Sequence, residues 1–419
     1  MALNTLEKRG LVTQVSDRAG LGEHLAASRR TLYCGFDPTA DSLHIGSLVP
    51  LLALRRFQVE GHRPILLLGG ATGLIGDPSF RDDERGLNDE ATVGAWVEKI
   101  RRQVEPFLDF EGNAGAMLAN NLDWTGGLEL IGFLREVGKH FSVNAMIQRD
   151  SVKNRLERDG AGISFTEFSY MLLQANDYLE LARRHGCSLQ VGGSDQWGNI
   201  VSGIDLVRRR LRREVFGLTV PLVSRRDGVK FGKTADGAVW LDPARTSPYR
   251  FYQYWLNSAD ADVIRFLKFF SFLDLDEIDA LEGEVRSSPE LRSAQKRLAE
   301  EVTALVHGRE ALRSAQRITM CLFGGEVRAL EEGDVEQLRQ DGMDCTVIAP
   351  GTGLLAALAQ AGLAASVSAG RRLVRAGGVS VNGEVLRDTG RVLDFSDALY
   401  GRYYLLRRGK KSWHLLIRS

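Results

Sequence analysis

Between residue 30 and about residue 225, short apolar segments alternate with longer stretches that have the periodicity of helices. The apolar segments at residues 31–36, 65–68 and 188–191 predict strands, and the alternation predicts a parallel α/β sheet covered by helices. In such a sheet, ligands bind beyond the carboxyl ends of the strands. We therefore look for a binding site in the loops that follow these strands.

The loop after the first predicted strand is polar and leads into an apolar helix that begins near His44. At such a point, free backbone N–H groups and the positive end of the helix dipole can bind phosphate. His44 can donate to a phosphoryl oxygen, and Gly46 has no Cβ to obstruct a base or ribose. Far downstream, KFGKT (residues 230–234) carries two ammonium groups and a hydroxyl that suit a leaving pyrophosphate. Each segment alone is more typical of a structural or solvated loop, but together they predict an ATP site.

Two further segments resemble parts of a binding site. The glycine-rich run GGATGLIGDP (residues 69–78) fits neither the dinucleotide spacing GxGxxG nor the phosphate-loop spacing GxxxxGK. The long helix predicted from about residue 165 to 185 has an apolar face, and Tyr170, Gln174 and Asp177 share another face at positions i, i+4 and i+7. That polar row indicates either a solvated surface or a binding site.

Charge is unevenly distributed along the chain. Residues 351–419 contain 11 Lys/Arg and 4 Asp/Glu, a net of +7, whereas residues 1–350 contain 43 and 50, a net of −7. A basic tail on an acidic body suggests a polyanionic partner, although a merely basic surface gives the same count.

The four cysteines are widely separated and form no CxxC pair, so the sequence predicts neither a zinc site nor a disulfide framework. Residues 1–17 mix charges with isolated apolar residues, unlike a secretory signal. The most apolar runs are far shorter than the ~18 residues of a membrane span. We expect a protein of the cytoplasm that does not enter a membrane.

The motifs resemble those of a known family. HIGS (residues 44–47) is similar to the HIGH motif of class I aminoacyl-tRNA synthetases, and KFGKT is similar to their KMSKS motif. YCGFDPT (33–39), the run at 69–78, FTEFSY (165–170) and GGSDQW (192–197) resemble, in order, those of bacterial tyrosyl-tRNA synthetases. GGVSVNG (377–383) resembles the S4 RNA-binding module. The resemblance covers nearly the whole chain.

The resemblance implies an α/β fold in four parts. These are a Rossmann-like catalytic domain at residues 1–235, an all-helical domain at 247–325, an acidic linker at 326–350, and a small α+β S4-like RNA-binding domain at 351–419. It also implies a homodimer formed by the α/β domain. An apolar stripe in the 133–141 region, comprising Phe133, Leu134, Val137 and Phe141, is a candidate interface, although an ordinary core helix would show the same spacing.

The same resemblance implies site residues. The catalytic residues would be His44, Lys230, Lys233, Thr234, Arg81 and Arg85. Tyrosine would be bound by Tyr33, Asp77, Tyr170, Gln174, Asp177 and Gln196. ATP would be bound by Gly35, Asp37, Thr39, His44, Gly46, Ser47, Gly193, Asp195 and Lys233. RNA would contact Arg208, Arg209, Arg371, Arg372 and Arg375.

The implied reaction is activation of L-tyrosine by ATP to tyrosyl-adenylate and pyrophosphate, followed by transfer of tyrosine to the 3′ end of tRNA(Tyr). Mg²⁺ is expected to accompany ATP, held by phosphate and water, with no metal bound by protein ligands alone. Positions that depart from the family pattern include Phe80, Arg81 and Asp82, where lysine is often found. Ser47 stands where histidine is common, and Pro50 cannot donate to the carbonyl of Gly46.

Three alternatives remain. A tryptophanyl-tRNA synthetase shares the fold and similar motifs, but Tyr33 paired with Asp177, together with the S4-like tail, argues against it. A non-catalytic RNA-binding paralogue predicts damaged ATP motifs, whereas His44, Gly46 and both loop lysines are present. A nucleotidylyltransferase with a HIGH motif predicts no amino-acid pocket and no RNA-binding tail.

Overall fold

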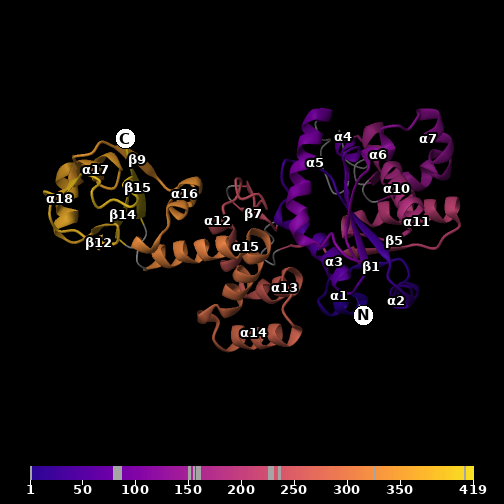
Figure 1. Ribbon diagram of the computed structural model, residues 1–419, viewed down its shortest axis with the longest axis horizontal. Coiled ribbons are helices and arrows are strands. Elements are labelled where there is room, and N and C mark those ends of the chain that lie inside the picture. Colours follow the sequence, from indigo (N-terminus) through magenta and orange to yellow (C-terminus); the bar gives the residue numbers. More distant parts are fainter. Residues whose placement is uncertain are drawn as a thin grey trace. The chain divides into compact units, whose positions relative to one another are not determined.

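The computed structural model describes residues 2–78, 87–149, 152–153, 156, 162–224, 231–234, 237–324, 327–409 and 412–419 (Figure 1). The chain forms two compact units. Unit 1 comprises Met1–Asp242 and Ala259–Ala294, and unit 2 comprises Pro243–Ser258 and Gln295–Ser419. Among the described residues, no helix is both long and apolar enough to cross a membrane.

Unit 1 is built on a six-stranded sheet with the order β1-β6-β5-β2-β3-β4. All neighbouring pairs are parallel except β1, which runs antiparallel to β6. Successive strands are added on one side from β2 to β4 and on the other from β5 to β6, so the order reverses between β2 and β5. Their bounds are β1 Gln14–Val15, β2 Thr31–Phe36, β3 Arg63–Leu68, β4 Met117–Asn120, β5 Cys187–Gly193 and β6 Phe216–Val220.

Alternating side chains of the sheet are buried against helices on its two faces. Tyr33, Ile65 and Leu67 belong to a core cluster with residues of α10 (Phe165–His185) and α11 (Trp197–Leu211). Their neighbours in sequence point to the other face because side chains alternate along a strand. Helix α3 (Leu48–Val59) packs on β2 and β3 and is absent from that cluster, so it covers this other face.

The remaining elements of unit 1 surround the sheet. The helices are α1 Ala2–Lys8, α2 Arg18–Ala27, α4 Thr72–Ile75, α5 Glu90–Val104, α6 Leu122–Thr125, α7 Leu130–Glu136, α8 Val143–Ile147, α13 Asp260–Phe270 and α14 Leu275–Ser287. Short 3-10 turns occupy Ile45–Ser47, Glu105–Phe107, Gly138–His140, Ser194–Gln196 and Pro289–Leu291, and a small hairpin comprises β7 Lys233–Thr234 and β8 Gly237–Ala238.

Unit 2 contains helices and a second sheet with the order β12-β11-β14-β15-β9. Its helices are α12 Pro248–Leu256, α15 Ser293–Phe323, α16 Glu332–Gln340, α17 Leu354–Gln360 and α18 Val367–Arg375; α15 begins at the end of unit 1. Its strands are β9 Cys345–Ile348, β10 Thr352–Gly353, β11 Val379–Val381, β12 Glu384–Val385, β13 Val392–Leu393, β14 Tyr403–Arg408 and β15 Ser412–Arg418. A short 3-10 turn covers Val327–Ala329.

The adjacent residues Asn382 and Gly383 predict a two-residue hairpin turn, and the structure confirms it between β11 and β12. Both residues have positive φ, 49° and 88°, as a two-residue turn of type I′ requires. The segment expected to be an acidic linker holds more structure than predicted. Besides helix α16, it contains β9, which pairs in parallel with β15 and completes the edge of the sheet. The segment is therefore a folded part of unit 2, although its many carboxylates are typical of a linker.

One other local expectation needs correction. The apolar spacing of Leu291, Leu298 and Val302 predicts a helix with all three on its buried face. Instead, Leu291 lies in the 3-10 turn and is exposed, because Arg292 adopts a left-handed φ of 52° and α15 begins only at Ser293. Pro50 is the third residue of α3. The N–H that proline lacks has no partner within a helix at this position.

Close packing between sheet and helix predicts a measurable cost at Gly217. A Cβ there would lie 2.3 Å from Ile200 Cγ2 on α11. We expect Gly217→Ala to lower the free energy of unfolding by about 1–3 kcal/mol, which outweighs the smaller gain of about 0.4–1 kcal/mol from a less flexible unfolded chain. Gly94→Ala on α5, where a Cβ meets nothing within 4 Å, should instead raise it slightly. Denaturant titration of both variants measures these free energies of unfolding. Equal values for the two variants would contradict the packing argument.

Candidate active site

A cavity of about 580 Å³ opens at the carboxyl ends of β2 and β5, where the strand order reverses. This is the position at which open parallel sheets bind ligands. The structure brings to its wall every described residue that the resemblance assigned to tyrosine, and every one assigned to ATP except Lys233. These are Tyr33, Gly35, Asp37, Thr39, His44, Gly46, Ser47, Asp77, Tyr170, Gln174, Asp177, Gly193, Asp195 and Gln196.

One end of the cavity is formed by the buried carboxylate of Asp177 on α10. Trp124 Nε1 donates to its Oδ1 at 2.8 Å, and Asn121 Nδ2 donates to its Oδ2 at 3.0 Å. Burial raises the pKa of Asp177 to about 7, although the two hydrogen bonds act in the opposite direction. The carboxylate is thus held in one orientation, and it is only partly ionised near pH 7.

Tyr33 lies on β2 beside this carboxylate. Its ring contacts Tyr178 edge-on, with 5.3 Å between the centroids. Its hydroxyl oxygen is buried and has no hydrogen-bond partner within the described part of the chain. Burial, followed by the nearby Asp177 charge, raises the pKa of Tyr33, so its phenol stays protonated. A buried polar group without a partner costs free energy, and a ligand that hydrogen-bonds to it would recover that cost.

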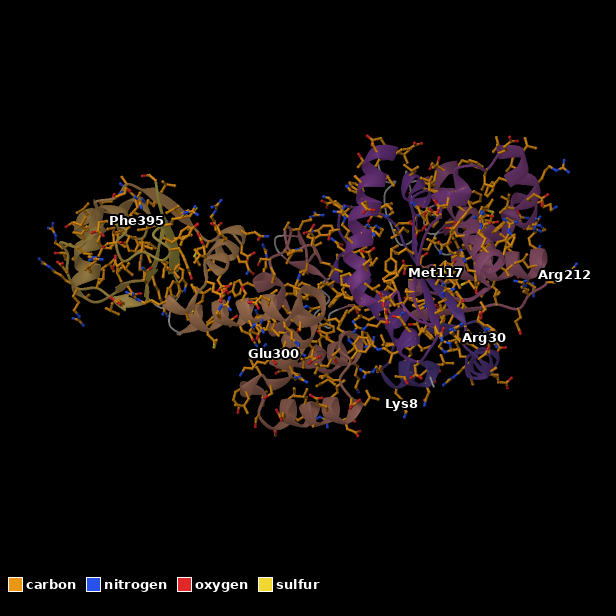
Figure 2. The ribbon with its side chains drawn as sticks, viewed as in Figure 1. Lys8, Arg30, Met117, Arg212, Glu300 and Phe395 are labelled. Carbon is orange, nitrogen blue, oxygen red and sulfur yellow. The ribbon has the colours of Figure 1, made fainter. Side chains whose placement is uncertain are left out.

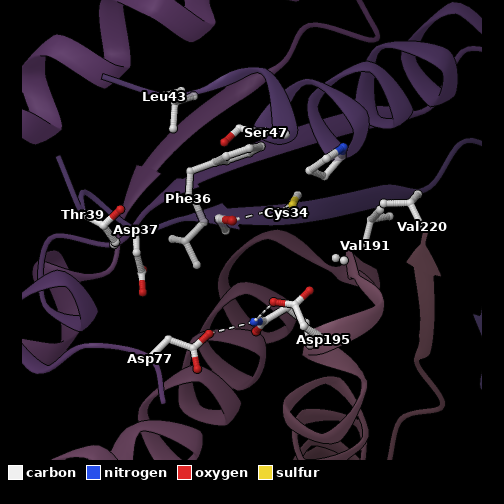
Figure 3. Close-up of a pocket in the computed structure, with 18 of the residues that line it drawn as sticks. Cys34, Phe36, Asp37, Thr39, Leu43, Ser47, Asp77, Val191, Asp195 and Val220 are labelled. Atoms are coloured by element: carbon white, nitrogen blue, oxygen red, sulfur yellow. Dashed lines mark hydrogen bonds between the residues drawn. The ribbon is translucent and has the colours of Figure 1, made fainter. Parts of the chain in front are cut away.

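Three further carboxylates gather at another side of the cavity. Tyr170 Oη donates to Asp37 Oδ2 at 2.7 Å, and Thr72 Oγ1 donates to Asp37 Oδ1 at 2.7 Å. Gln196 Nε2 donates to Asp77 at 2.7 Å and to Asp195 at 3.0 Å (Figure 3). Asp37, assigned by the resemblance to the phosphates, is therefore bonded to Tyr170, a residue assigned to the substrate ammonium.

Acidic crowding changes the protonation of this corner. Burial raises the pKa of Asp195, and the charge of Asp77 adds to the shift. Burial and then Asp37 and Asp77 raise the pKa of Tyr170 far above its ordinary value. Gln174 Oε1 accepts from Asn199 Nδ2 at 3.0 Å. The corner offers several acceptors with negative charge and therefore suits a cation.

His44 begins the 3-10 turn that leads into α3. Its Nδ1 accepts from the backbone N–H of Gly46 at 3.0 Å, and desolvation lowers its pKa. A neutral imidazole with Nδ1 as acceptor carries its proton on Nε2, so Nε2–H is the donor available to a ligand. Gly46 has a reason of its own to be glycine, because a Cβ would lie 2.7 Å from His44 Cε1.

The segment after the lysine motif is bonded to the His44 turn. Val239 N donates to Gly232 O at 2.8 Å, Ile45 N donates to Val239 O at 3.0 Å, and Leu241 N donates to Leu43 O at 2.8 Å. Gly232 has a φ of 76°. The two signature motifs, almost 190 residues apart, are thus neighbours through main-chain hydrogen bonds. Of the assigned catalytic residues, Lys230, Arg81 and Arg85 lie outside the described residues, and only the backbone of Lys233 and Thr234 in β7 is described.

The arginines assigned to RNA lie on two separate surfaces. Arg208 and Arg209 are exposed near the end of α11 and face Asp205, and Arg212 closes that helix at the outer surface of unit 1 (Figure 2). Arg210 differs from its neighbours because it bonds to Glu136 and to its carbonyl. In unit 2, Arg371, Arg372 and Arg375 are all exposed on α18.

Sequence reasoning missed residues that shape the cavity. Asn121 and Trp124 follow β4, and Thr72 opens α4; all three connect to Asp177 or Asp37. The signal was available in part, since polar residues directly after a parallel strand lie at the ligand-binding edge. The short strand Met117–Asn120 was not recognised, so the residues after it were not considered.

Comparison with known proteins identifies the family. Residues 26–324 match the family model described as tRNA synthetases class I (W and Y), and residues 334–416 match that of the tyrosine–tRNA ligase SYY-like C-terminal domain. A tyrosine–tRNA ligase from Salmonella paratyphi B is 57% identical over 415 residues, 99% of this chain and 98% of that protein. The first match includes tryptophan enzymes, whereas the other two favour tyrosine.

Comparison with solved structures supports the same family. A C-terminally truncated mitochondrial tyrosyl-tRNA synthetase from Aspergillus nidulans matches with a TM-score of 0.70 and 32% identity, covering 77% of this chain and 94% of that one. Its counterpart from Coccidioides posadasii matches with a TM-score of 0.67 and 34% identity, covering 75% and 91%. The chain therefore belongs to the tyrosine–tRNA ligases, a family of class I aminoacyl-tRNA synthetases.

Proposed function

We propose that the cavity of unit 1 activates L-tyrosine with ATP to give tyrosyl-adenylate and pyrophosphate, and that the protein then transfers tyrosine to the 3′ end of tRNA(Tyr). The observation that carries the assignment is the pairing of a buried carboxylate, Asp177, with a buried phenol, Tyr33, whose oxygen has no partner among the described residues. A carboxylate accepts from the substrate phenol and Tyr33 donates to it. Phenylalanine would leave both groups unpaired.

The acidic corner receives the substrate ammonium. Tyr170, Gln174 and Asp77 supply acceptors around it, and Gln196 joins this group to Asp195. Opposite charge at short range is strongly favoured in a site that is partly removed from water. With the phenol at Asp177 and the ammonium at this corner, the substrate carboxylate is left to face the ATP side of the cavity.

Adenylate formation needs no general base, because the attacking carboxylate is already ionised. Catalysis then consists of in-line positioning and stabilisation of charge on the separating phosphoryl groups. His44 Nε2–H, Lys230, Lys233 and Thr234 supply donors or charge, with Arg81 and Arg85 from the loop after Pro78. Gly35, Thr39, Gly46, Ser47, Gly193 and Asp195 hold the nucleotide. ATP enters as its magnesium complex, in which phosphate oxygens and water hold the ion.

RNA binding is assigned to the exposed arginines. Arg208 and Arg209 contact the acceptor stem, and Arg371, Arg372 and Arg375 on α18 contact another part of the tRNA. The net charge of +7 in residues 351–419 supports the second assignment. Within the described part of the chain, Cys34, Cys187 and Cys345 form no disulfide, which is consistent with action in the cytoplasm.

A homodimer formed by unit 1 is supported by a face that shares only Leu134 with the expected stripe. Val137 is buried, and Phe133 and Phe141 pack partly buried against the core, so most of the predicted stripe is ordinary interior. Helix α7 instead exposes Leu130, Ile131 and Leu134, at 70%, 66% and 46%. Three adjacent exposed apolar side chains on one helix favour a protein interface.

The tyrosine pocket is tested by amino-acid-dependent pyrophosphate exchange. We expect the protein to support exchange with tyrosine, and Tyr33→Phe and Asp177→Asn to narrow the preference for tyrosine over phenylalanine, by about 0.5–3 kcal/mol for each lost hydrogen bond. The Michaelis constant for ATP should barely change because neither residue is assigned to the phosphates. Leu32→Val, on the same strand and facing the other side of the sheet, is the control. An unchanged preference in both pocket variants would place the phenol elsewhere.

Tyrosine affinity should depend on pH through Asp177. The pKa of this carboxyl is about 7 in the free protein, and the ionised form is the better acceptor for the phenol. As the pH falls from 8 to 6 the ionised fraction decreases, so the dissociation constant for tyrosine should rise about tenfold. Calorimetric titration across this range is the measurement. Asp177→Asn should remove the dependence, and a flat profile in the unaltered protein would contradict the assignment.

The interface is tested by light scattering at micromolar concentration. We expect a mass of twice 46.3 kDa for the unaltered chain and a shift toward the monomer for Ile131→Glu, since a charge within an apolar interface is strongly unfavourable. Glu129→Lys, beside the same helix but polar in both forms, serves as control. A monomer in the unaltered chain would reject the dimer.

A further inference from the structure

Phe231, the second residue of the lysine motif, is docked on helix α13. Its ring is stacked on that of Phe270, with centroids 5.4 Å apart and an interplanar angle of 13°, and lies 5.3 Å from the ring of Phe266. Both partners are buried, at 0% and 2% exposure. Such aromatic contacts stabilise a structure beyond the burial of the rings alone. The motif is therefore attached to a rigid element through the residue that follows Lys230.

Helix α13 is in turn fixed to the helix that follows the His44 turn. Arg56 of α3 donates through Nη2 to Ser271 O at 2.7 Å and to Phe269 O at 3.2 Å, and Arg9, which follows α1, donates to Lys268 O at 3.3 Å. These carbonyls end α13, where helical acceptors lack partners and the dipole is negative. Burial, and then repulsion by Arg9 and Arg55, lowers the pKa of Arg56 to about 9. The buried cation thus satisfies the end of α13 and joins that end to α3.

The two attachments connect the His44 turn to Phe231 through two helices. The His44 turn leads into α3, and Arg56 of α3 is bonded to the end of α13. Aromatic rings of α13 in turn contact Phe231. On the opposite side of the motif, Gly232 is fixed by its bond from Val239 N and by close packing, since a Cβ at Gly232 would lie 3.0 Å from Ile45 Cγ1. The first of the two lysines is adjacent in sequence to the docked phenylalanine.

We propose that Phe231 is a positioning residue for adenylate formation: by stacking on Phe270 it sets where the lysine motif stands relative to His44. The proposal rests on the proposed function. Charge stabilisation in the transition state depends steeply on geometry, and misplacement by about 1 Å can cost about a hundredfold in rate. The aromatic contact would therefore act on the phosphoryl transfer and not on tyrosine binding, which takes place at the other end of the cavity.

The test uses the full-length protein and pyrophosphate exchange with tyrosine. Phe231→Ala should lower kcat by about tenfold or more while the KM for tyrosine stays within about twofold, because the lost stabilisation belongs to the transition state. Phe231→Leu, which keeps an apolar side chain of similar reach, should recover most of kcat. Phe270→Ala should resemble Phe231→Ala, and the double variant should lose little more than either single one, since both remove the same contact.

The control is Leu267→Ala, which empties an equally buried position on α13 that has no ring contact with Phe231. It should reduce thermal stability but leave kcat within about twofold. Two results would overturn the proposal and show that Phe231 has only a structural role. One is a loss of kcat in Leu267→Ala as large as in Phe231→Ala, and the other is no recovery of kcat in Phe231→Leu. Absence of tyrosine-dependent exchange in the unaltered protein would instead overturn the proposed function.

Discussion

The reversal of strand order between β2 and β5 is the constraint on which the site depends. Because helices leave the sheet in opposite directions on the two sides of this point, the carboxyl ends of the two strands are left uncovered. Tyr33 from β2 and the Gly193 turn after β5 then line one cavity. Under the proposed function this cavity holds the two substrates side by side, with the pair assigned to the phenol beside α10 and the His44 turn at the start of α3.

Under the proposed function, the burial of Asp177 supports the preference for tyrosine, and it also disfavours the ionised carboxylate. Desolvation disfavours the ionised carboxylate, while charged hydrogen bonds such as those from Asn121 and Trp124 return about 1.5–3 kcal/mol each. The balance leaves a pKa of about 7, above the ordinary 3.8. Because the pKa of Asp177 is raised by folding, its protonated form contributes to the free energy of unfolding at low pH. That contribution is lost as the pH rises through 7. The ionised form, to which the proposed function assigns tyrosine binding, is thus the less stable form of the site, as expected where function and stability compete.

Much of this arrangement could be predicted from sequence where local pattern and tertiary environment agree. The sequence predicts the strand at residues 31–36 and the helix at 165–185 with their observed bounds. In both segments the spacing of the apolar residues reflects which face is buried. Prediction was poorer where a single backbone angle decides. Arg292 in a left-handed conformation moved Leu291 off the expected stripe, and β9 could not be seen as a strand because only its pairing with β15 makes it one.

The same distinction explains which parts of the site were found. Residues grouped by spacing, such as Tyr170, Gln174 and Asp177 on one helix face, follow from helical geometry. Asn121 and Trp124 reach Asp177 from a segment more than 50 residues away, and no local pattern marks them. Gly46 shows a third case, in which the residue was found but the reason was not. The sequence suggests that the missing Cβ leaves room for a nucleotide, whereas in the structure it leaves room for the imidazole of His44. The backbone N–H of Gly46 also donates to His44 Nδ1, which fixes the tautomer that leaves Nε2–H as donor.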